Sequence, residues 1–161
     1  MTTDLSKLPP EIMELTMLSH LARMGHPRPY IERYFKIEPE AGLGLPPVVP
    51  MLFENEPNQD YYYQQLFGKR AAWLVEPEGP EPPAWMVDAL CLKDRKARWS
   101  SFVAAVLFAK MCTVPGTHVL CAVNSEETFK SIHKFMDTFY FNMPEYARPT
   151  KGTTWGVEMK T

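Results

Sequence analysis

The chain has 161 residues, which is enough for one domain with room for an appendage. With 45 % hydrophobic and 22 % charged residues, the composition excludes an intrinsically disordered protein. The net charge of −2 excludes a surface that is basic throughout, so any contact with a polyanion has to be local.

Cysteine and histidine usage narrows the class further. Cys91, Cys112 and Cys121 are odd in number and lack CxxC spacing, which fits a reducing compartment. The four histidines show no ligand spacing with cysteines or carboxylates, so we expect no structural zinc. The N-terminus lacks an apolar signal core, and no uncharged apolar run reaches the roughly 18 residues of a membrane span. We therefore expect a cytoplasmic protein without a membrane partner.

Residues 8–38 have the pattern of two helices. Apolar residues from Ile12 onward recur with a one-sided helical period, Gly25 ends the first helix, and Pro29 opens the second. The methionines of this region either fill the core or form a partner-binding surface, and core filling is the commoner outcome for such side chains. They are Met13, Met17 and Met24.

The middle of the chain predicts a connection, a helix and a linker. Residues 39–59 contain several prolines and glycines with little periodicity. Residues 60–76 predict an amphipathic helix, and 76–83 predict a stiff, acidic, proline-rich linker. We therefore divide the chain into a helical N-terminal region with its connection (1–59), a helix with a linker (60–83) and a C-terminal unit (84–161).

The C-terminal unit alternates apolar strands with helices. The pattern predicts strands at 85–92, 118–123 and 155–159, and helices at 100–112 and 125–141. Asn124 is expected to cap the last helix, with Glu127 completing a capping box. Strand–helix–strand–helix–strand order implies a parallel sheet, so the expected fold class is α/β with a partial P-loop-type sheet behind a helical N-terminal region.

The segment 93–101 is rich in basic and hydroxyl side chains and joins the first of these strands to its helix. Helix N-termini at such junctions bind phosphate through free N–H groups and the helix dipole. Positive charge there is otherwise unfavourable by roughly 0.3–1 kcal/mol per exposed residue, which favours a bound anion. A solvated loop, softened by Asp94, is the alternative. The candidate phosphate-binding side chains are Lys93, Arg95, Lys96, Arg98, Ser100 and Ser101.

The segment lacks the GxxxxGK[ST] phosphate-loop pattern, but with its flanking strand and helix it resembles the ATPase motor of large terminase subunits from tailed bacteriophages. That family often has a deviant loop of the form K-x-R-x-x-G-x-S-[ST], and the resemblance covers about residues 85–145. It implies that Lys93 and Arg95 contact ATP phosphates, that Ser100 or Ser101 ligates Mg²⁺, and that Gln64 or Gln65 contacts adenine.

Two features depart from the family pattern. Arg98 stands at the glycine position, where a glycine would allow unusual dihedral angles and a close approach to phosphate. No apolar strand ending in acidic residues follows residue 124, so the Walker B strand needed for hydrolysis is missing and no catalytic residue can be named.

Three functions remain open on this basis. The first is a terminase-like DNA-packaging motor fragment that binds nucleotide but is incomplete for hydrolysis alone. Its partners would be a second chain that completes the motor, a small terminase subunit or a portal, with DNA reached through the complex. The second is a non-enzymatic phage interaction protein that retains part of an ATPase fold. A free-standing nucleic-acid binder is disfavoured by the net charge.

Overall fold

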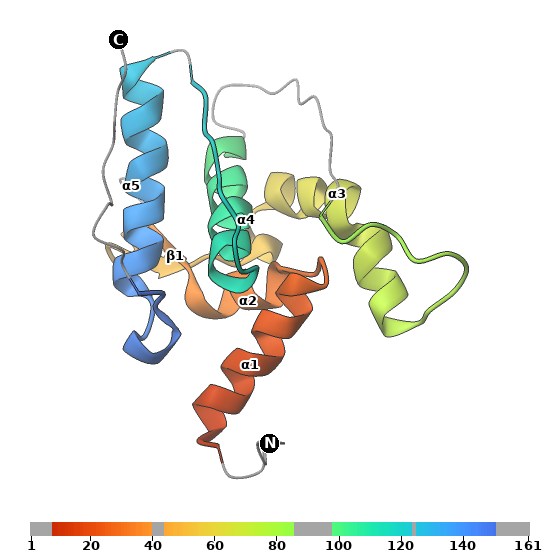
Figure 1. The fold of residues 1–161 in the computed structure, drawn as a ribbon. Coiled ribbons are helices and arrows are strands. Elements are labelled where there is room, and N and C mark those ends of the chain that lie inside the picture. The colour runs from red at the N-terminus through yellow and green to blue at the C-terminus, as the bar shows by residue number, and fades with distance from the viewer. Residues whose placement is uncertain (1–7, 40–43, 86–97, 124, 151–161) are drawn as a thin grey trace.

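The computed structural model describes residues 8–39, 44–85, 98–123 and 125–150, and these residues are mainly helical (Figure 1). Helix α4 lies between α5 and α3, with α1 and α2 at its C-terminal end (Figure 1). The elements in chain order are α1 (Pro10–Arg23), α2 (Arg28–Tyr34), β1 (Lys36–Ile37), β2 (Val49–Pro50), the 3₁₀ turn η2 (Phe53–Asn55), α3 (Pro57–Val75), α4 (Trp99–Thr113), α5 (Glu126–Asn142) and the 3₁₀ turn η3 (Glu145–Ala147).

The sheet shows that the α/β fold class expected from the sequence is wrong. Among the described residues, the sheet consists of β1 and β2, paired antiparallel with Ile37 opposite Val49. The described residues contain no parallel sheet of the P-loop type. Residues 118–123, expected as a strand, pair with no strand there. The other two expected strands, except for Trp85, lie outside the described residues.

Helix α4 explains why helices, rather than a sheet, organise this protein. Its sequence is apolar on almost every side, and such a helix has to be surrounded to be stable. Ala104, Ala105 and Ala109 are buried and small, so neighbouring helices can approach closely. α1, α2, α3 and α5 all pack against α4. Among the described residues, α4 is therefore the centre of a helical bundle and not a helix packed on a sheet.

Aromatic side chains hold α2, α4 and α5 together. The Phe35 ring stacks on Phe139 of α5, with centroids 4.8 Å apart, and lies 5.4 Å from the Phe108 ring of α4. Tyr30 of α2 meets Phe35 edge to face at 5.8 Å. All four side chains are at most 1 % exposed, so this cluster forms the centre of the core.

The corner between α1 and α2 confirms the break expected at Gly25. The residue has φ = +91°, and the α1 carbonyls of Leu21 and Ala22 accept hydrogen bonds from the amides of His26 and Gly25. Pro27 then precedes α2. Such a left-handed residue just past a helix is the usual place for glycine.

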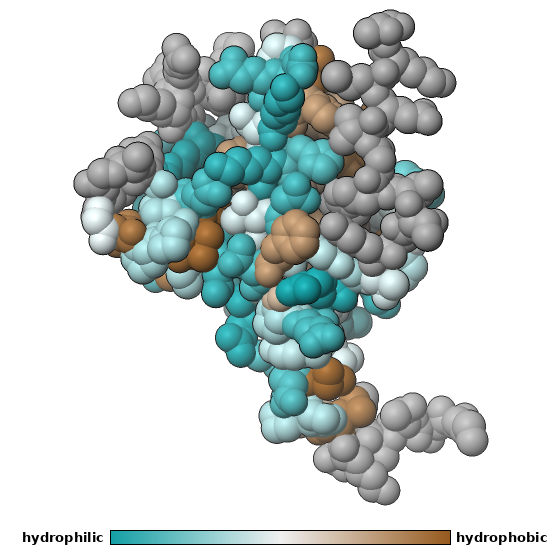
Figure 2. Space-filling model, turned by 90° about the vertical axis from the view of Figure 1, so that its left-hand side faces the viewer, coloured by the Kyte–Doolittle hydropathy of each residue, from teal (hydrophilic) through white to brown (hydrophobic). Residues whose placement is uncertain are grey.

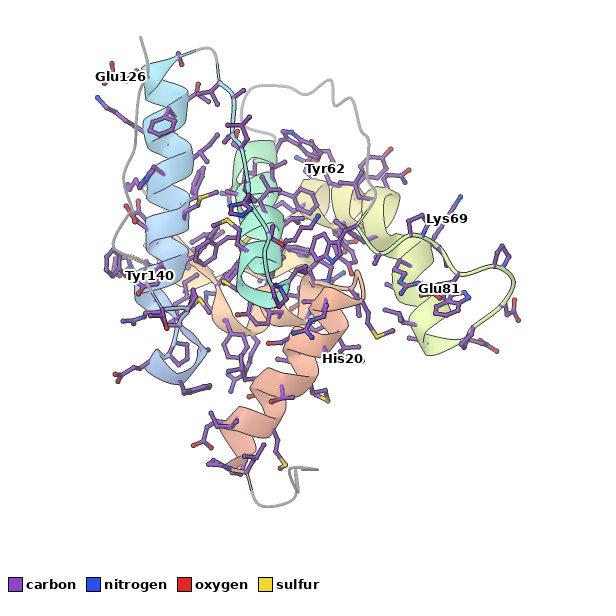
Figure 3. All side chains as sticks on the ribbon, in the orientation of Figure 1. His20, Tyr62, Lys69, Glu81, Glu126 and Tyr140 are labelled. Atoms are coloured by element: carbon purple, nitrogen blue, oxygen red, sulfur yellow. The ribbon has the colours of Figure 1, made fainter. Side chains whose placement is uncertain are left out.

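The acidic segment 76–83 folds back onto α3. The Trp73 indole N–H donates to the Gly79 carbonyl at 3.4 Å, and the Arg70 guanidinium donates to the Pro82 carbonyl at 2.8 Å. Figure 3 shows Glu81 beside the C-terminal half of α3. The segment is therefore attached to the helical body and does not extend away from it as a free spacer.

Helix α5 begins one residue later than expected. Ser125 is the N-cap, and its Oγ accepts the amide of Thr128 at 3.2 Å. Asn124, the expected cap, lies outside the described residues. Glu127 occupies the second helical position, so the expected capping box is wrong and Thr128 stands where its glutamate was placed.

Candidate functional site

The expected phosphate-binding segment ends where α4 begins. Lys93, Arg95 and Lys96 lie outside the described residues, and Arg98 is the N-cap of α4. Arg98 has φ = +54° and ψ = +21°, the left-handed conformation that a glycine at this position would adopt readily. For an arginine this conformation costs roughly 1–2 kcal/mol. The guanidinium of Arg98 donates to the carboxylate of Glu56, which helps hold the residue there.

The hydroxyl of Ser101 is part of a buried network. It donates to the Arg98 carbonyl at 2.8 Å and accepts from the side-chain amide of Gln59 at 3.0 Å. Gln59 is fully buried in the first turn of α3, so these bonds join the first turns of α3 and α4. A magnesium ion at Ser101 would have to displace this network. Ser100 is half-buried at the second position of α4.

Gln64 is not brought to this junction. It follows Gln59 by five residues on α3, which turns it by roughly 140° around the helix axis. Its side chain is exposed and lies over Gly68 on its own helix. Tyr62, which Figure 3 shows where α3 meets α4, packs edge to face on Trp99 at 4.7 Å. The Tyr62 ring therefore joins α3 to α4. The adenine contact expected for Gln64 remains a prediction.

A hollow of about 340 Å³ lies beside the junction. It is bounded by the β1–β2 region and by the ion pair of Arg98 with Glu56, and most of its other lining residues are apolar. Arg98 is thus an expected phosphate-binding residue that lines a hollow.

A second polar cluster joins the start of α2 to α3. Arg28 donates to Glu32 at 2.8 Å and to Asp60 of α3 at 2.6 Å. Glu32 also accepts the backbone amide of Phe53 at 3.1 Å. The Arg28 guanidinium also lies 5.4 Å from the centre of the Phe53 ring. Two carboxylates therefore balance its charge, and an aromatic ring packs beside it.

His26 and Tyr63 complete this cluster with a hydrogen bond between the imidazole Nδ1 and the phenol oxygen. Burial lowers the pKa of His26, and the nearby Arg28 charge lowers it further. Burial raises the pKa of Tyr63 well above its usual value. At neutral pH the phenol is therefore protonated and donates to a neutral imidazole. Tyr63 is 1 % exposed and His26 is half-buried, so this pair joins the α1–α2 corner to α3.

Few features of the sequence point to this cluster. Arg28 and Glu32 have the i, i+4 spacing of a helical ion pair, but Asp60 and Tyr63 lie on a separate helix. In the sequence, His26 indicates only that the first helix ends there. Among the described residues there is no group of three or more histidine, cysteine or acidic residues that could hold a metal ion.

Of the two described cysteines, Cys112 is unreactive, and neither is part of a disulfide. Burial raises the pKa of Cys112 to about 12, so its thiol stays protonated at neutral pH and is a poor nucleophile. Cys112 and Cys121 are both free thiols.

Several large apolar side chains lie on the protein surface. Met13 and Met17 on α1 are 41 % and 58 % exposed, so the expectation that they fill the core is wrong. Leu120, between α4 and α5, is 93 % exposed, and Val75 at the end of α3 is 84 % exposed. Figure 2, which views the molecule from the α5 side, shows a mostly hydrophilic face with hydrophobic patches, one of them at the projecting end of α1.

Comparison of the chain with protein-family models, curated proteins and solved structures found no match in any of the three. No helix in the described ranges is both long enough and apolar enough to cross a membrane.

Proposed function

We propose that this chain is a non-enzymatic interaction protein that inserts the methionine face of α1 into an apolar groove of a partner protein. The observation that carries the proposal is the exposure of Met13 and Met17, which stand one helical turn apart on a helix that projects from the body (Figure 1).

The two faces of α1 have different roles. Leu18 and Ala22 are buried against the core, and Leu15 packs beside them. Met13 and Met17 are therefore not needed to hold α1 in place. Large apolar side chains on successive turns are the anchors of a helix that binds in a groove. Methionine suits such a surface because its flexible thioether adapts to the groove that receives it.

The polar groups of the described residues support a role without catalysis. The most enzyme-like pair, His26 and Tyr63, joins the α1–α2 corner to α3, with a neutral imidazole and a protonated phenol at neutral pH. The hydroxyl of Ser101 is committed to contacts between helices. An interaction protein needs neither a free nucleophile nor a metal site.

Met17→Asp is expected to weaken partner binding by at least about tenfold, because a buried anchor of a groove contact is replaced by a charge. A photoreactive residue at position 17 will identify the partner, with position 75 as the control for exposed apolar surface elsewhere. Binding of the purified partner is then measured by calorimetry. Because Met17 is 58 % exposed, the free energy of unfolding should change by less than about 0.5 kcal/mol. Equal cross-linking from positions 17 and 75, or unchanged affinity of the variant, would contradict the proposal.

Nucleotide-phosphate binding is a second candidate, as in a terminase-like motor fragment. What favours it is the start of α4 at the basic segment and the place of Arg98 on the wall of a hollow. The described residues form no parallel sheet. This second candidate therefore proposes phosphate binding by the basic segment without a P-loop fold.

Titration with a labelled ATP analogue and Mg²⁺ tests this candidate. If it is correct, binding saturates and Lys93→Ala weakens it by about tenfold or more, because a phosphate contact through a charged hydrogen bond is lost. Lys69→Ala, at an exposed lysine on α3, is the matched control and should bind like the native chain. Absence of saturable binding excludes the candidate.

A further inference from the structure

The segment 117–123 has the alternating exposure of a β-strand, and no described strand pairs with it. The chain runs from the end of α4 back to the start of α5 and passes in front of α4 (Figure 1). Its side chains alternate along the whole segment: Thr117, Val119, Cys121 and Val123 are half-buried, whereas His118, Leu120 and Ala122 are exposed. A period of two is that of a β-strand with one face on a core.

The backbone of this segment is open as well. Before the segment, the Val114 amide donates to the Lys110 carbonyl, and after it the Phe129 amide donates to the Ser125 carbonyl. None of the backbone hydrogen bonds among the described residues involves positions 117–123. Within the described part of the chain, the N–H and C=O groups of this segment are unpaired and so can pair with another extended chain. An exposed row of such groups is a template for strand pairing.

The side chains do nothing to discourage pairing. From Met111 to Ser125 the sequence contains no lysine, arginine, aspartate or glutamate, although charged residues make up 22 % of the chain. Natural edge strands are usually protected by charge, and this one carries an exposed leucine at its midpoint.

We propose that residues 117–123 pair antiparallel with the same segment of a second copy of this chain. A two-fold axis relates identical segments in opposite directions, so the pairing can be self-complementary. An axis through the midpoint sets Leu120 against Leu120 and His118 against Ala122, and no charges of like sign meet. The segment carries no lysine, arginine, aspartate or glutamate that the axis would set against its own copy, which is why we assign a second copy as the occupant.

This self-association uses a surface separate from α1 and goes beyond the partner binding proposed above. A strand pair of this length buries less area than a standard interface of roughly 1,200–2,000 Å². The dimer is therefore weak and depends on protein concentration.

Sedimentation velocity over a concentration series measures this dimer. Leu120→Asp should weaken it by about tenfold or more, because two carboxylates would stand directly opposite each other. Val75→Asp, at a similarly exposed apolar position on α3, should leave it unchanged. A native chain that stays monomeric throughout, or a dimer unaffected by Leu120→Asp, overturns the proposal. A dimer lost equally in Val75→Asp or Met17→Asp overturns the assignment to this segment.

A cysteine trap tests the register. Opposite residues of an antiparallel pair have Cα atoms roughly 4.5–5.5 Å apart, within the range of a disulfide. Leu120→Cys in a Cys91→Ser/Cys121→Ser chain should therefore form a covalent dimer on mild oxidation. Val75→Cys in the same background should not, and Cys112 remains in both as a buried thiol. Equal covalent dimer in the two variants contradicts the pairing.

Discussion

Gly25→Ala is expected to lower the free energy of unfolding by about 3 kcal/mol or more, although it adds only one methyl group. A Cβ on Gly25 would lie 2.3 Å from the carbonyl oxygen of Ala84, and that atom belongs to the backbone and cannot rotate away. Overpacking of this kind costs roughly 1–3 kcal/mol, and the φ of +91° adds roughly 1–2 kcal/mol for any residue with a Cβ. Urea denaturation of native and variant proteins measures the difference.

Gly79→Ala is the matched control for the dihedral angle. Gly79 also has a positive φ, +69°, but a Cβ there would meet nothing within 4 Å. Its substitution should cost only the dihedral penalty of about 1–2 kcal/mol. Equal losses in the two variants would show that the approach of Ala84 to Gly25 does not limit stability.

The helices could be predicted from local signals. The prolines at the start of α1, Gly25 after it, and the apolar period of α3 are properties of a few neighbouring residues, and the helices form where these signals indicate. The sheet could not be predicted in this way. Strand formation depends on which chain lies alongside, and 118–123 has strand-like side chains without a neighbouring strand among the described residues.

The buried face of α4 shows a further limit of the pattern. Met111 of α4 is 37 % exposed, whereas the small residues Ala104 and Ala105 are buried. A helix that is apolar all round carries no sequence signal for its most buried side. Which side is covered is decided by the four helices that pack around it.

The candidate site was partly predictable for the same reason. The start of α4 at the basic segment follows from local sequence. The partners of that segment do not, because Glu56 and Gln59 lie about forty residues earlier on another helix. These two side chains engage Arg98 and Ser101, so the contacts that decide the role of the segment come from tertiary structure.

Arg70→Met is expected to cost about 3 kcal/mol. Arg70 is 5 % exposed, and its guanidinium donates to the carbonyls of Met24, at 2.6 Å, and Pro82, at 2.8 Å. Methionine keeps the apolar stem but leaves both carbonyls without their donor, at roughly 1–3 kcal/mol for each group that stays buried. Arg70 thus ties the α1 corner and the acidic segment to α3. Urea denaturation measures the loss, and limited proteolysis should cleave the variant faster within 76–83.

Two controls separate the carbonyl contacts of Arg70 from its charge. Glu81 pairs with Arg70 at 2.7 Å but is 57 % exposed, so Glu81→Gln should cost less than about 1 kcal/mol. Arg33→Met breaks the exposed pair with Glu14 and should cost equally little. A Glu81→Gln loss as large as that of Arg70→Met would mean that the ion pair, and not the two carbonyls, holds this corner. With a small loss, the arginine acts as a buried hydrogen-bond donor that joins three segments of one chain.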